Sequence, residues 1–526
     1  MSDTVRCTID GLTVEVPKGT TILEAAARAG IDVPHYCYHP ALSAPAQCRI
    51  CLVEVEGVAK LVPACVTAVA DGAVVRTESD AALAARKGVM EFLLINHPLD
   101  CPVCDQSGEC GLQDYAYEEG RKFGRLKEPK RVIGRDDFGG DVLFEGDRCI
   151  LCTRCVRFMR EIARDERLAV VQRGDRNTID TFFDRGLEGS LWAGNVVDIC
   201  PVGALLSKDF LHKARAWDLD RVPSVCPSCS HGCNIRLEVR DNQVMRLKPR
   251  PNPEVNSYWM CDVGRFNYRW LNRQDRLEAP LVRQGERLLA TTWSVALNDL
   301  VERLRGRRGG AMLVSPLLSN EDLGAARRLA DALGFQALGF RVAEGPEEAL
   351  PGWSKLKLRR ERAANVEGAR RLGFVRWGGA DGRGGLERLQ GPVVVIVGDE
   401  LGDADVAWAP QAELVIVVGP VLSAPLRQRV DFALPATTFA EMEGTFTNAE
   451  GRVQRFWPAL VPPGMARPSW QILGVLLAGL IGAPVPASAA DAFALLGDVC
   501  RDFAGFRYDD LGPWGRILPQ PAAIEA

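Results

Sequence analysis

Residues 97–110 read His97-Pro-Leu-Asp-Cys101-Pro-Val-Cys104-Asp-Gln-Ser-Gly-Glu-Cys110. One histidine and three cysteines stand at H-x3-C-x2-C-x5-C spacing, short enough for one loop to wrap a single cofactor. Soft thiolates with one imidazole suit zinc or an iron–sulfur cluster. Pro98 and Pro102 keep the backbone out of a helix and hold the loop extended between the ligands. Taken alone, the spacing favours a structural zinc site, but the other cysteines of the chain change this interpretation.

The chain has 526 residues, enough for several domains with packed cores. Its 64 basic and 68 acidic residues give a formal charge of −4, and no tail carries a block of like charge. This balance argues against binding to nucleic acid or to an anionic membrane surface. Residues 1–10 lack the layout of a signal peptide, and the longest apolar run, 472–483, is too short to cross a bilayer. We therefore expect a soluble chain without a transmembrane segment, which reaches a membrane only by docking on other proteins.

Cysteine usage is the outstanding feature of the composition. Fourteen of the 17 cysteines fall between Cys37 and Cys233, mostly in C-x2-C steps, and none occurs in residues 262–499. Because cytosolic thiols stay reduced, this spacing in a chain without an export signal indicates metal ligation over disulfides.

The N-terminal segment carries the first group of ligands. Two alternating runs flank Asp10-Gly11, which predicts a hairpin, and a capping box at Thr21 opens an Ala-rich helix that ends at Gly30. Four cysteines follow at C-x10-C-x2-C-x13-C spacing, and we call them the first group: Cys37, Cys48, Cys51 and Cys65. This order resembles the β-grasp ferredoxins, which hold a [2Fe–2S] cluster on four thiolates, with a longer loop than the plant type. His35 and His39 flank Cys37, and we interpret both as surface loop histidines.

The opening stretch supplies the second group, namely His97, Cys101, Cys104 and Cys110. A helical pattern over residues 81–95 leads into it, and a second helix is expected over residues 112–122. The third group consists of Cys149, Cys152, Cys155 and Cys200, the last followed by Pro201.

In two-cluster bacterial ferredoxins, each half reads C-x2-C-x2-C-x3-C-P, and the fourth cysteine serves the other half's cluster. Here the first half has Met159 in place of its fourth cysteine, and the second half has Ser190, Ala193 and Val196 in place of its first three. All four missing thiolates belong to one cluster. The segment therefore resembles a two-cluster ferredoxin fold that holds one [4Fe–4S] cluster and has lost its twin.

The fourth group is spaced C-x2-C-x3-C-x27-C and consists of Cys226, Cys229, Cys233 and Cys261. It resembles the [4Fe–4S] module at the head of molybdopterin oxidoreductases, and a zinc ribbon is the alternative. His231 lies inside the loop and is interpreted as a neighbour, because four cysteines complete the site. Only Cys7 and Cys500 then remain, and we interpret both as ordinary semi-buried thiols.

The C-terminal half has another character. Residues 311–314 predict a buried strand, and Ser319-Asn320 caps a helix that runs to Leu333 with Gly334 behind it. The β-branched runs 393–397 and 414–418 predict parallel strands of an open α/β sheet. Residues 352–391 are expected to form a surface excursion, and residues 518–526 a tail.

The four groups in this order resemble the large (75 kDa-type) iron–sulfur subunit family of respiratory complex I, NADH–quinone oxidoreductase. The likeness runs to about Asn272, and a thinner one rests on residues 434–446 and 450–455. It implies a multidomain α+β and α/β fold: a β-grasp ferredoxin-like [2Fe–2S] domain (1–79), a [4Fe–4S] domain with one histidine and three cysteine ligands (80–120), a ferredoxin-like [4Fe–4S] domain with one cluster lost (138–215), a [4Fe–4S] domain of molybdopterin-oxidoreductase type (219–275) and a shortened molybdopterin-oxidoreductase-like α/β domain without a molybdenum ligand (276–526).

The resemblance also implies a function. Electrons would leave flavin in an NADH-binding partner subunit, pass through one [2Fe–2S] and three [4Fe–4S] clusters, and continue toward quinone through other peripheral-arm subunits. The chain would be a peripheral subunit of this translocase on the cytoplasmic face of the inner (cell) membrane, with no catalytic residue or independent substrate site of its own. The alternative within the same class is the iron–sulfur subunit of an NAD-linked formate dehydrogenase or hydrogenase.

Two rival classes are weighed against this function. A molybdenum or tungsten formate dehydrogenase commonly needs a cysteine on the metal, which residues 262–499 lack, and a Lys where the turn after Cys261 has Val263. We therefore expect no molybdenum or pterin. A zinc-bound scaffold without a redox role is the other rival. The Gly-rich residues 378–385 do not lie between a strand and a helix, as a dinucleotide-binding motif requires, so no flavin or nicotinamide site is expected on this chain.

Overall fold

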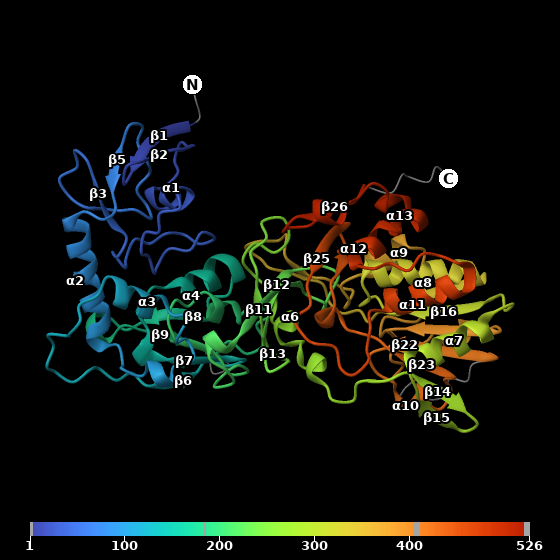
Figure 1. Cartoon of the computed structure of the whole chain (residues 1–526). Helices are drawn as coiled ribbons and strands as arrows, with labels where there is room; N and C mark the ends of the chain where they lie inside the picture. The colour runs from blue at the N-terminus through green and yellow to red at the C-terminus, as the bar shows by residue number, and fades with distance from the viewer. Residues whose placement is uncertain (1–3, 183–185, 403–404, 406–410, 520–526) are drawn as a thin grey trace. The chain divides into compact units, whose positions relative to one another are not determined.

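The computed structural model describes residues 4–182, 186–402, 405 and 411–519. These residues form a mixed α and β structure that divides into two compact units (Figure 1). Unit 1 comprises Met1–Leu219 and Leu350–Trp353, and unit 2 comprises Asp220–Ala349 and Ser354–Ala526. Within the described part of the chain, every helix is too short or too polar to cross a membrane.

Unit 1 begins with a five-stranded sheet of order β2-β1-β5-β3-β4. Its strands are β1 (Thr4–Ile9), β2 (Leu12–Pro17), β3 (Leu52–Val55), β4 (Val62–Pro63) and β5 (Val74–Arg76). Asp10 and Gly11 join β1 to β2 with positive φ angles of 46° and 85°, as a two-residue hairpin turn requires. Helix α1 (Ile22–Arg28) opens with the capping box of Thr21 and Glu24. Both local predictions are therefore confirmed.

Two helices frame the second group. Helix α2 (Asp80–Asn96) begins after the N-cap Ser79 and ends at His97, so the predicted helix 81–95 is confirmed. A short 3-10 turn, η1 (Cys101–Val103), lies in the loop, and α3 (Gly111–Glu118) follows it. Helix α3 ends before Gly120, earlier than the expected residue 122.

The rest of unit 1 is built from short elements. A three-stranded sheet has the order β10-β7-β6, and β8 pairs with β9 in a hairpin. The strands are β6 (Arg135–Asp137), β7 (Val142–Glu145), β8 (Leu168–Val171), β9 (Thr178–Thr181) and β10 (Leu205–Ser207). The helical segments are η2 (Gly146–Arg148), α4 (Arg154–Arg157), the π-helix η3 (Phe158–Ala163), η4 (Gly174–Arg176), α5 (Asn195–Asp198) and η5 (Ala216–Asp218).

Unit 2 opens with an antiparallel sheet of β11 (Asp220–Val225), β12 (Asn234–Arg240) and β13 (Gln243–Pro249), followed by α6 (Asp262–Phe266) and η6 (Arg269–Asn272). Its main sheet has eight strands in the order β15-β14-β23-β22-β21-β16-β17-β20. These strands are β14 (Leu281–Gln284), β15 (Arg287–Ala290), β16 (Gly310–Val314), β17 (Ala337–Phe340), β20 (Val375–Arg376), β21 (Val393–Val397), β22 (Leu414–Gly419) and β23 (Phe432–Pro435). The six strands from β23 to β20 are parallel, which confirms the predicted open α/β sheet.

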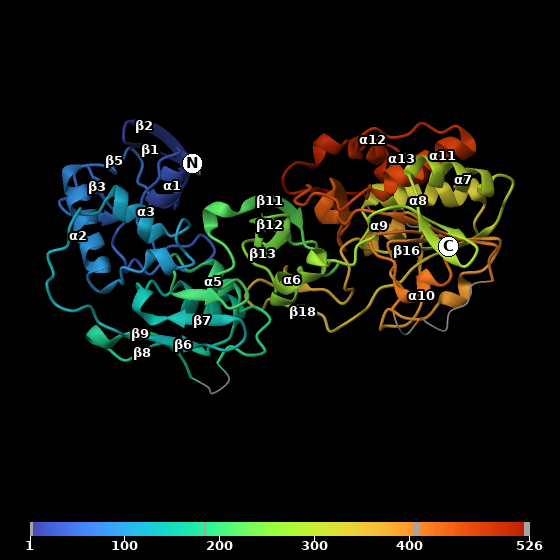
Figure 2. The ribbon, with the colours of Figure 1, turned by 60° about the horizontal axis from the view of Figure 1, so that its bottom comes forward.

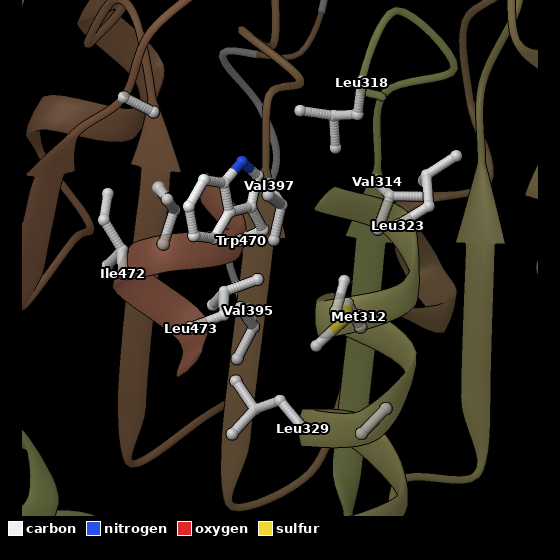
Figure 3. Packing of buried hydrophobic residues seen from close by; sticks show 14 of the residues in the cluster. Met312, Val314, Leu318, Leu323, Leu329, Val395, Val397, Trp470, Ile472 and Leu473 are labelled. Carbon is white, nitrogen blue, oxygen red and sulfur yellow. The ribbon is translucent and has the colours of Figure 1, made fainter. Parts of the chain in front are cut away.

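Helices cover both faces of this sheet (Figure 2). Alternate residues of β16 and β21 face opposite sides, since Met312 and Val395 pack against α8 and α11 while Leu313 and Ile396 belong to the core on the other face. Figure 3 shows the first of these cores, where Leu323 of α8 and Leu473 of α11 meet strand residues. The helices are α7 (Trp293–Leu304), α8 (Asn320–Leu333), α9 (Val366–Arg371), α10 (Ala424–Arg427), α11 (Ser469–Ile481), α12 (Ala489–Ala494) and α13 (Leu496–Val499).

Shorter elements complete unit 2. A three-stranded sheet consists of β24 (Gly444–Thr447), β25 (Arg452–Phe456) and β26 (Arg516–Ile517), and β18 (Glu348–Ala349) pairs with β19 (Lys357–Leu358). The remaining helical turns are η7 (Leu386–Arg388), η9 (Phe439–Glu441), η10 (Arg501–Phe503) and η11 (Tyr508–Leu511).

Two predictions about the C-terminal half are wrong. Residues 352–391 are not a surface excursion, because Val366 and Ala369 of α9 are fully buried in the main core and Trp377 is 2% exposed. The expected tail begins with Leu518, which is buried and donates its backbone N–H to Gly451 O at 2.8 Å. Residues 520–526 lie outside the described residues. By contrast, helix α8 begins at the predicted Ser319 cap and ends at Gly334 with φ 65°.

Candidate metal centres

The four cysteines of the first group lie together in the loops around β3 and β4. The thiols of Cys48 and Cys65 donate hydrogen bonds to the sulfur of Cys37, which hold the pKa of Cys37 well below its usual range. Cys65 also bonds Cys51, so the four side chains form one connected set. Positive φ angles at Ala46 and Arg49 wind the intervening loop around this centre. The structure therefore brings together all four predicted residues of this group.

The second group spans the end of α2 and the start of α3. Cys101 opens η1, Cys104 donates its N–H to Cys101 O at 3.2 Å, and Cys110 is the residue before α3. Burial raises the pKa of Cys110 to about 11, and the first-turn N–H groups of Leu112 and Gln113 donate to its sulfur. Helix N-terminal N–H groups stabilise an anionic ligand at this position.

His97 is the C-cap of α2, and a small surface hollow is lined by this residue together with Cys149 of the third group. Burial lowers the pKa of His97 to about 4. The imidazole is therefore neutral at pH 7, which is the state that binds a metal.

The third group combines two buried thiols, Cys152 and Cys155, with two half-buried ones, Cys149 and Cys200. Cys149, Cys152, Cys155 and Cys200 all interact electrostatically with one another. Burial raises the pKa of Cys149 to about 12 and that of Cys152 to about 11. Positive φ angles at Leu151 (51°) and Thr153 (59°), rare outside glycine, wrap the backbone around the thiols. Backbone N–H groups from the stretch after Cys200 donate to its sulfur: Val202, Ala204 and Leu205.

The fourth group lies in unit 2. Cys226 and Cys233 are joined by a backbone hydrogen bond of 2.8 Å, and Cys261 caps α6 by accepting the N–H of Gly264 at 3.3 Å. A Cβ atom added to Gly264 would stand 2.9 Å from the sulfur of Cys226 and 3.6 Å from that of Cys261, so the two sulfurs face one point. Burial raises the pKa of Cys226 to about 11, and Cys229 interacts with each of the other three thiols.

The donor chemistry of the four groups fits iron–sulfur clusters. Each has four cysteine or histidine side chains that are largely withdrawn from water, and most of the sulfurs accept backbone N–H bonds that favour an anionic thiolate. Among the described residues, no three His, Cys, Asp or Glu side chains stand close enough to hold one metal ion. The ligands of a multi-iron cluster bind different iron atoms and so stand farther apart.

Hydrogen bonds join the loops of the three groups in unit 1. Tyr36, next to Cys37, donates its hydroxyl to Gly111 O at 3.3 Å, and Gly111 N donates to Pro201 O at 3.2 Å. Arg148, next to Cys149, donates to Asp100 at 2.6 Å and to Gly203 O at 3.4 Å. The Tyr36–Gly111, Gly111–Pro201 and Arg148–Asp100 contacts tie residues beside ligands of different groups, so the three loops form one assembly.

Sequence reasoning did not identify these connecting residues. Tyr36, Arg148 and the Arg154–Arg157 turn stand directly beside ligands, and that adjacency is the local signal that points to them. The expectations for the other histidines and thiols are mixed. His39 was expected at the surface but is partly buried, and burial lowers its pKa to about 4. Cys7 was expected to be semi-buried but is only 2% exposed. His231 is buried, with Nε2 3.0 Å from Val255 O, and Cys500 is half-buried as predicted.

Five family models match the chain in order. They are described as a 2Fe-2S iron-sulfur cluster binding domain (residues 2–80), an NADH-ubiquinone oxidoreductase-G iron-sulfur binding region (86–125), the ferredoxin-like domain of NADH-quinone oxidoreductase subunit 3 (139–206), the Fe4S4 domain of molybdopterin oxidoreductases (219–273) and molybdopterin oxidoreductase (352–478).

Curated relatives carry closely related names. The NADH-quinone oxidoreductase G subunit of Rickettsia felis is 40% identical over 333 residues, 63% of this chain and 49% of the relative. The 75 kDa subunit of NADH-ubiquinone oxidoreductase from Reclinomonas americana is 45% identical over 297 residues, 56% of this chain and 43% of that one. The G subunit of Streptomyces coelicolor is 42% identical over 356 residues, 66% and 42% of the two chains. The chain thus matches less than half the length of these relatives.

A chain of an NAD+-reducing [NiFe]-hydrogenase is 30% identical, and the match covers 41% of this chain and 91% of that chain. The TM-score of this match is 0.36. The named relatives and the matched domains agree with one another. The chain is therefore a homologue of the large iron–sulfur subunit of NADH–quinone oxidoreductase, which is named the G subunit or the 75 kDa subunit in these relatives.

Proposed function

We propose that this chain is an electron-transfer subunit of NADH–quinone oxidoreductase and relays electrons from a flavin-bearing partner subunit toward quinone. One [2Fe–2S] and three [4Fe–4S] clusters would be held by the four groups. The first group would hold the [2Fe–2S] cluster within domain 1–79. The [4Fe–4S] clusters would lie on the second group within domain 80–120, the third within domain 138–215 and the fourth within domain 219–275, with domain 276–526 carrying no molybdenum or pterin.

The single observation that carries this proposal is the linked set of ligand loops in unit 1. Tyr36 and Gly111 bond across the first and second groups, and Gly111 and Pro201 bond across the second and third. Three redox centres in one packed unit suit a relay, because each iron–sulfur cluster accepts and releases one electron with little structural change.

The residues of this chain would supply three things to the clusters. Burial excludes water from the thiols, backbone N–H groups stabilise their negative charge, and a neutral His97 differs from the thiolates as a ligand. Hydrogen bonds to sulfur, net charge and solvent exposure are the factors that tune cluster potentials. The bond-making steps would then belong to partner subunits, since we assign no substrate site to this chain.

The partners that follow are the NADH- and flavin-binding subunit and other peripheral-arm subunits. Through them the chain would lie on the cytoplasmic face of the inner (cell) membrane as a peripheral part of a translocase. The names of the relatives, which are subunits of a larger oxidoreductase, support this assignment.

Electron paramagnetic resonance (EPR) of the dithionite-reduced protein, combined with iron, zinc and molybdenum counts, tests the proposal. We expect one [2Fe–2S] and three [4Fe–4S] signals and no stoichiometric zinc or molybdenum. Zinc in place of iron would indicate a zinc-bound scaffold without a redox role. Stoichiometric molybdenum or tungsten would indicate a catalytic enzyme. Reduction of the clusters by formate or hydrogen in the purified complex, with NAD+ as acceptor, would instead assign the chain to a formate dehydrogenase or hydrogenase.

A further inference from the structure

Arg157 touches ligand residues of two different groups. It lies at the end of α4, two residues after Cys155, and is 4% exposed. One guanidinium nitrogen, Nη2, donates to Cys37 O of the first group and, at 3.3 Å, to Cys152 O of the third group. Nη1 donates to Ser43 O, and Nε donates to Thr153 Oγ1 at 3.3 Å. The side chain therefore bridges the first and third groups directly.

The hydrogen-bond partners of Arg157 are all neutral. In the part of the chain that the structure describes, no carboxylate forms an ion pair with it. The acid that acts on it electrostatically, Glu161, is bound elsewhere, accepting from Ser43 N at 2.9 Å and from Ser43 Oγ at 2.5 Å. A guanidinium stays charged at every accessible pH, and a buried charge is costly unless an opposite charge compensates it.

The compensating charges available to Arg157 are the sulfurs. The groups that favour its charge are Cys152 first, then Cys37 and then Glu161, and the neighbouring cation Arg154 acts against it. A cluster on each group would be anionic and would gain a further negative charge on reduction. A fixed cation between two such centres stabilises the reduced state of both and so raises both potentials.

We propose that Arg157 is the shared counter-cation of the first and third groups and sets the potentials of both clusters together. This inference rests on the proposed function, because it requires clusters on both groups. Arg157 is a positioning residue, since it acts through the carbonyls and charges of the ligand residues and does not bind the metal.

Redox titration of the full-length holoprotein, monitored by EPR, tests this inference. The signals are first assigned with single Cys→Ser variants, one for each group. Arg157→Gln keeps a hydrogen-bonding side chain but removes the charge, so we expect the midpoint potentials of the first and third groups to fall. The fourth group, in unit 2, serves as the internal reference and keeps its midpoint.

Two further variants separate charge from shape. Arg157→Lys keeps the charge and loses the forked contacts, so we expect it to recover most of both potentials. Glu161→Gln removes a negative charge beside the guanidinium, and we expect both potentials to rise. The matched control is Arg86→Gln, since Arg86 is also buried but bonds Glu119 at 2.8 Å and Thr77 O at 2.6 Å, away from any ligand residue. Its loss should move neither midpoint.

Unmoved midpoints in Arg157→Gln, or a shift in only one of the two groups, overturn the inference. If Arg157→Gln does not fold, the midpoints of Arg157→Lys and Glu161→Gln test the inference instead. Unchanged midpoints in Glu161→Gln then refute the inference. A wild-type protein without the [2Fe–2S] and [4Fe–4S] signals refutes the proposed function instead, so the two failures are distinguishable.

Discussion

Two of the described glycines stand where any larger residue would meet the sulfur of a proposed cluster ligand. A Cβ atom on Gly203 would lie 2.3 Å from the sulfur of Cys104, and one on Gly264 would lie 2.9 Å from that of Cys226. Neither glycine has a positive φ angle, so backbone freedom is not what they provide. Each leaves room for a thiol that belongs to a distant stretch of the chain.

Gly203→Ala should therefore expel the second cluster and spare the others. The new methyl group would overlap Cys104 and also approach Gln106 Cβ at 3.2 Å, so the thiol must leave its position. We expect EPR of the reduced variant to lack the second group's signal, and its iron content to fall by one cluster. Gly88→Ala is the matched control, because Gly88 in α2 has nothing within 4 Å and the change should stabilise the helix by about 0.5–1 kcal/mol. A full set of signals in Gly203→Ala would contradict the prediction.

His97→Cys should lower the midpoint potential of the second cluster. The imidazole is neutral at pH 7, since burial lowers its pKa to about 4, so a thiolate in its place adds negative charge to the cluster. Added negative charge disfavours reduction, as the comparison of His-ligated Rieske centres with all-cysteine centres illustrates. A redox titration of the variant measures the change, and an equal or higher midpoint would count against His97 as a ligand.

The stability of unit 2 should fall as the pH rises from about 4.5 to about 8. Burial raises the pKa of Glu321 from 4.5 to about 8, although Thr445 donates to both carboxylate oxygens at 3.0 and 2.9 Å. The folded state then holds a proton that the unfolded state has released. Stability from this group is complete below pH 4.5 and is lost through pH 8, at about 1.4 kcal/mol for each unit of pKa difference.

Thermal unfolding of wild type and Glu321→Gln between about pH 5 and pH 9 measures this effect. The variant should show a shallower decline, with a residual slope from Asp322, whose pKa is raised by burial to about 6. If the stability of the two proteins declined with pH at the same rate, Glu321 would not be the source of the pH dependence.

At the scale of elements, the hairpin of β24 and β25 holds the loop of the fourth group in place through hydrogen bonds. Ala449 N donates to Ser230 O at 2.7 Å, Asn448 Nδ2 to His231 O at 3.1 Å, and Gln454 Nε2 to Gly232 O at 2.7 Å. Successive carbonyls between Cys229 and Cys233 are therefore held by a hairpin more than 200 positions later. This gives the C-terminal domain a structural role without requiring a cofactor of its own.

Gln454→Ala should weaken the fourth cluster selectively. The change leaves Gly232 O without its buried donor, at a cost of about 1–3 kcal/mol, and removes one of two donors to Asn234 Oδ1, which Gln454 bonds at 2.7 Å and Asn252 at 2.8 Å. We expect faster loss of the fourth group's EPR signal during incubation with an iron chelator, while the signals of unit 1 persist. Gln243→Ala, at an exposed position of β13, is the control. Equal rates of loss in the two variants would contradict the assignment.

At the scale of the whole molecule, the two units differ in what holds them together. Unit 2 packs two apolar cores against opposite faces of its main sheet, with fully buried residues such as Leu313 and Val397. The segment of unit 1 from β6 to β10 has strands of only three or four residues, and two thiols of its third group, Cys152 and Cys155, are buried. Metal binding contributes directly to folding where ligands are buried and the elements are short.

Removal of the iron should therefore reduce the protection of unit 1 against local unfolding and leave the core of unit 2 folded. In the apoprotein, the thiols of the third group are buried without a bound cation, so the loops 149–155 and 199–205 should open. Hydrogen–deuterium exchange of holo and apo protein should show faster exchange in these loops and in 97–110, with unchanged protection of β16, β21 and β22. Equal loss of protection in both units would refute this division.

Local signals were sufficient for much of the fold. The turn at Asp10-Gly11, the caps at Thr21 and Ser319 and the strands β21 and β22 depend on neighbouring residues or on a short apolar run, and all were predicted correctly. Residues 352–391 were misjudged because α9 has a weak pattern of its own and is buried by elements that come before and after it in the chain.

The sequence by itself determined the identity and spacing of the candidate ligands, because most of the cysteines that would wrap one cluster stand within a few residues of one another along the chain. The tertiary structure alone decided which backbone and charge surrounds each ligand. Arg157 against Cys37, Gly203 against Cys104 and Gln454 against Gly232 are contacts between distant segments. Such contacts leave no local pattern, since they depend on how the loops pack after the chain has folded.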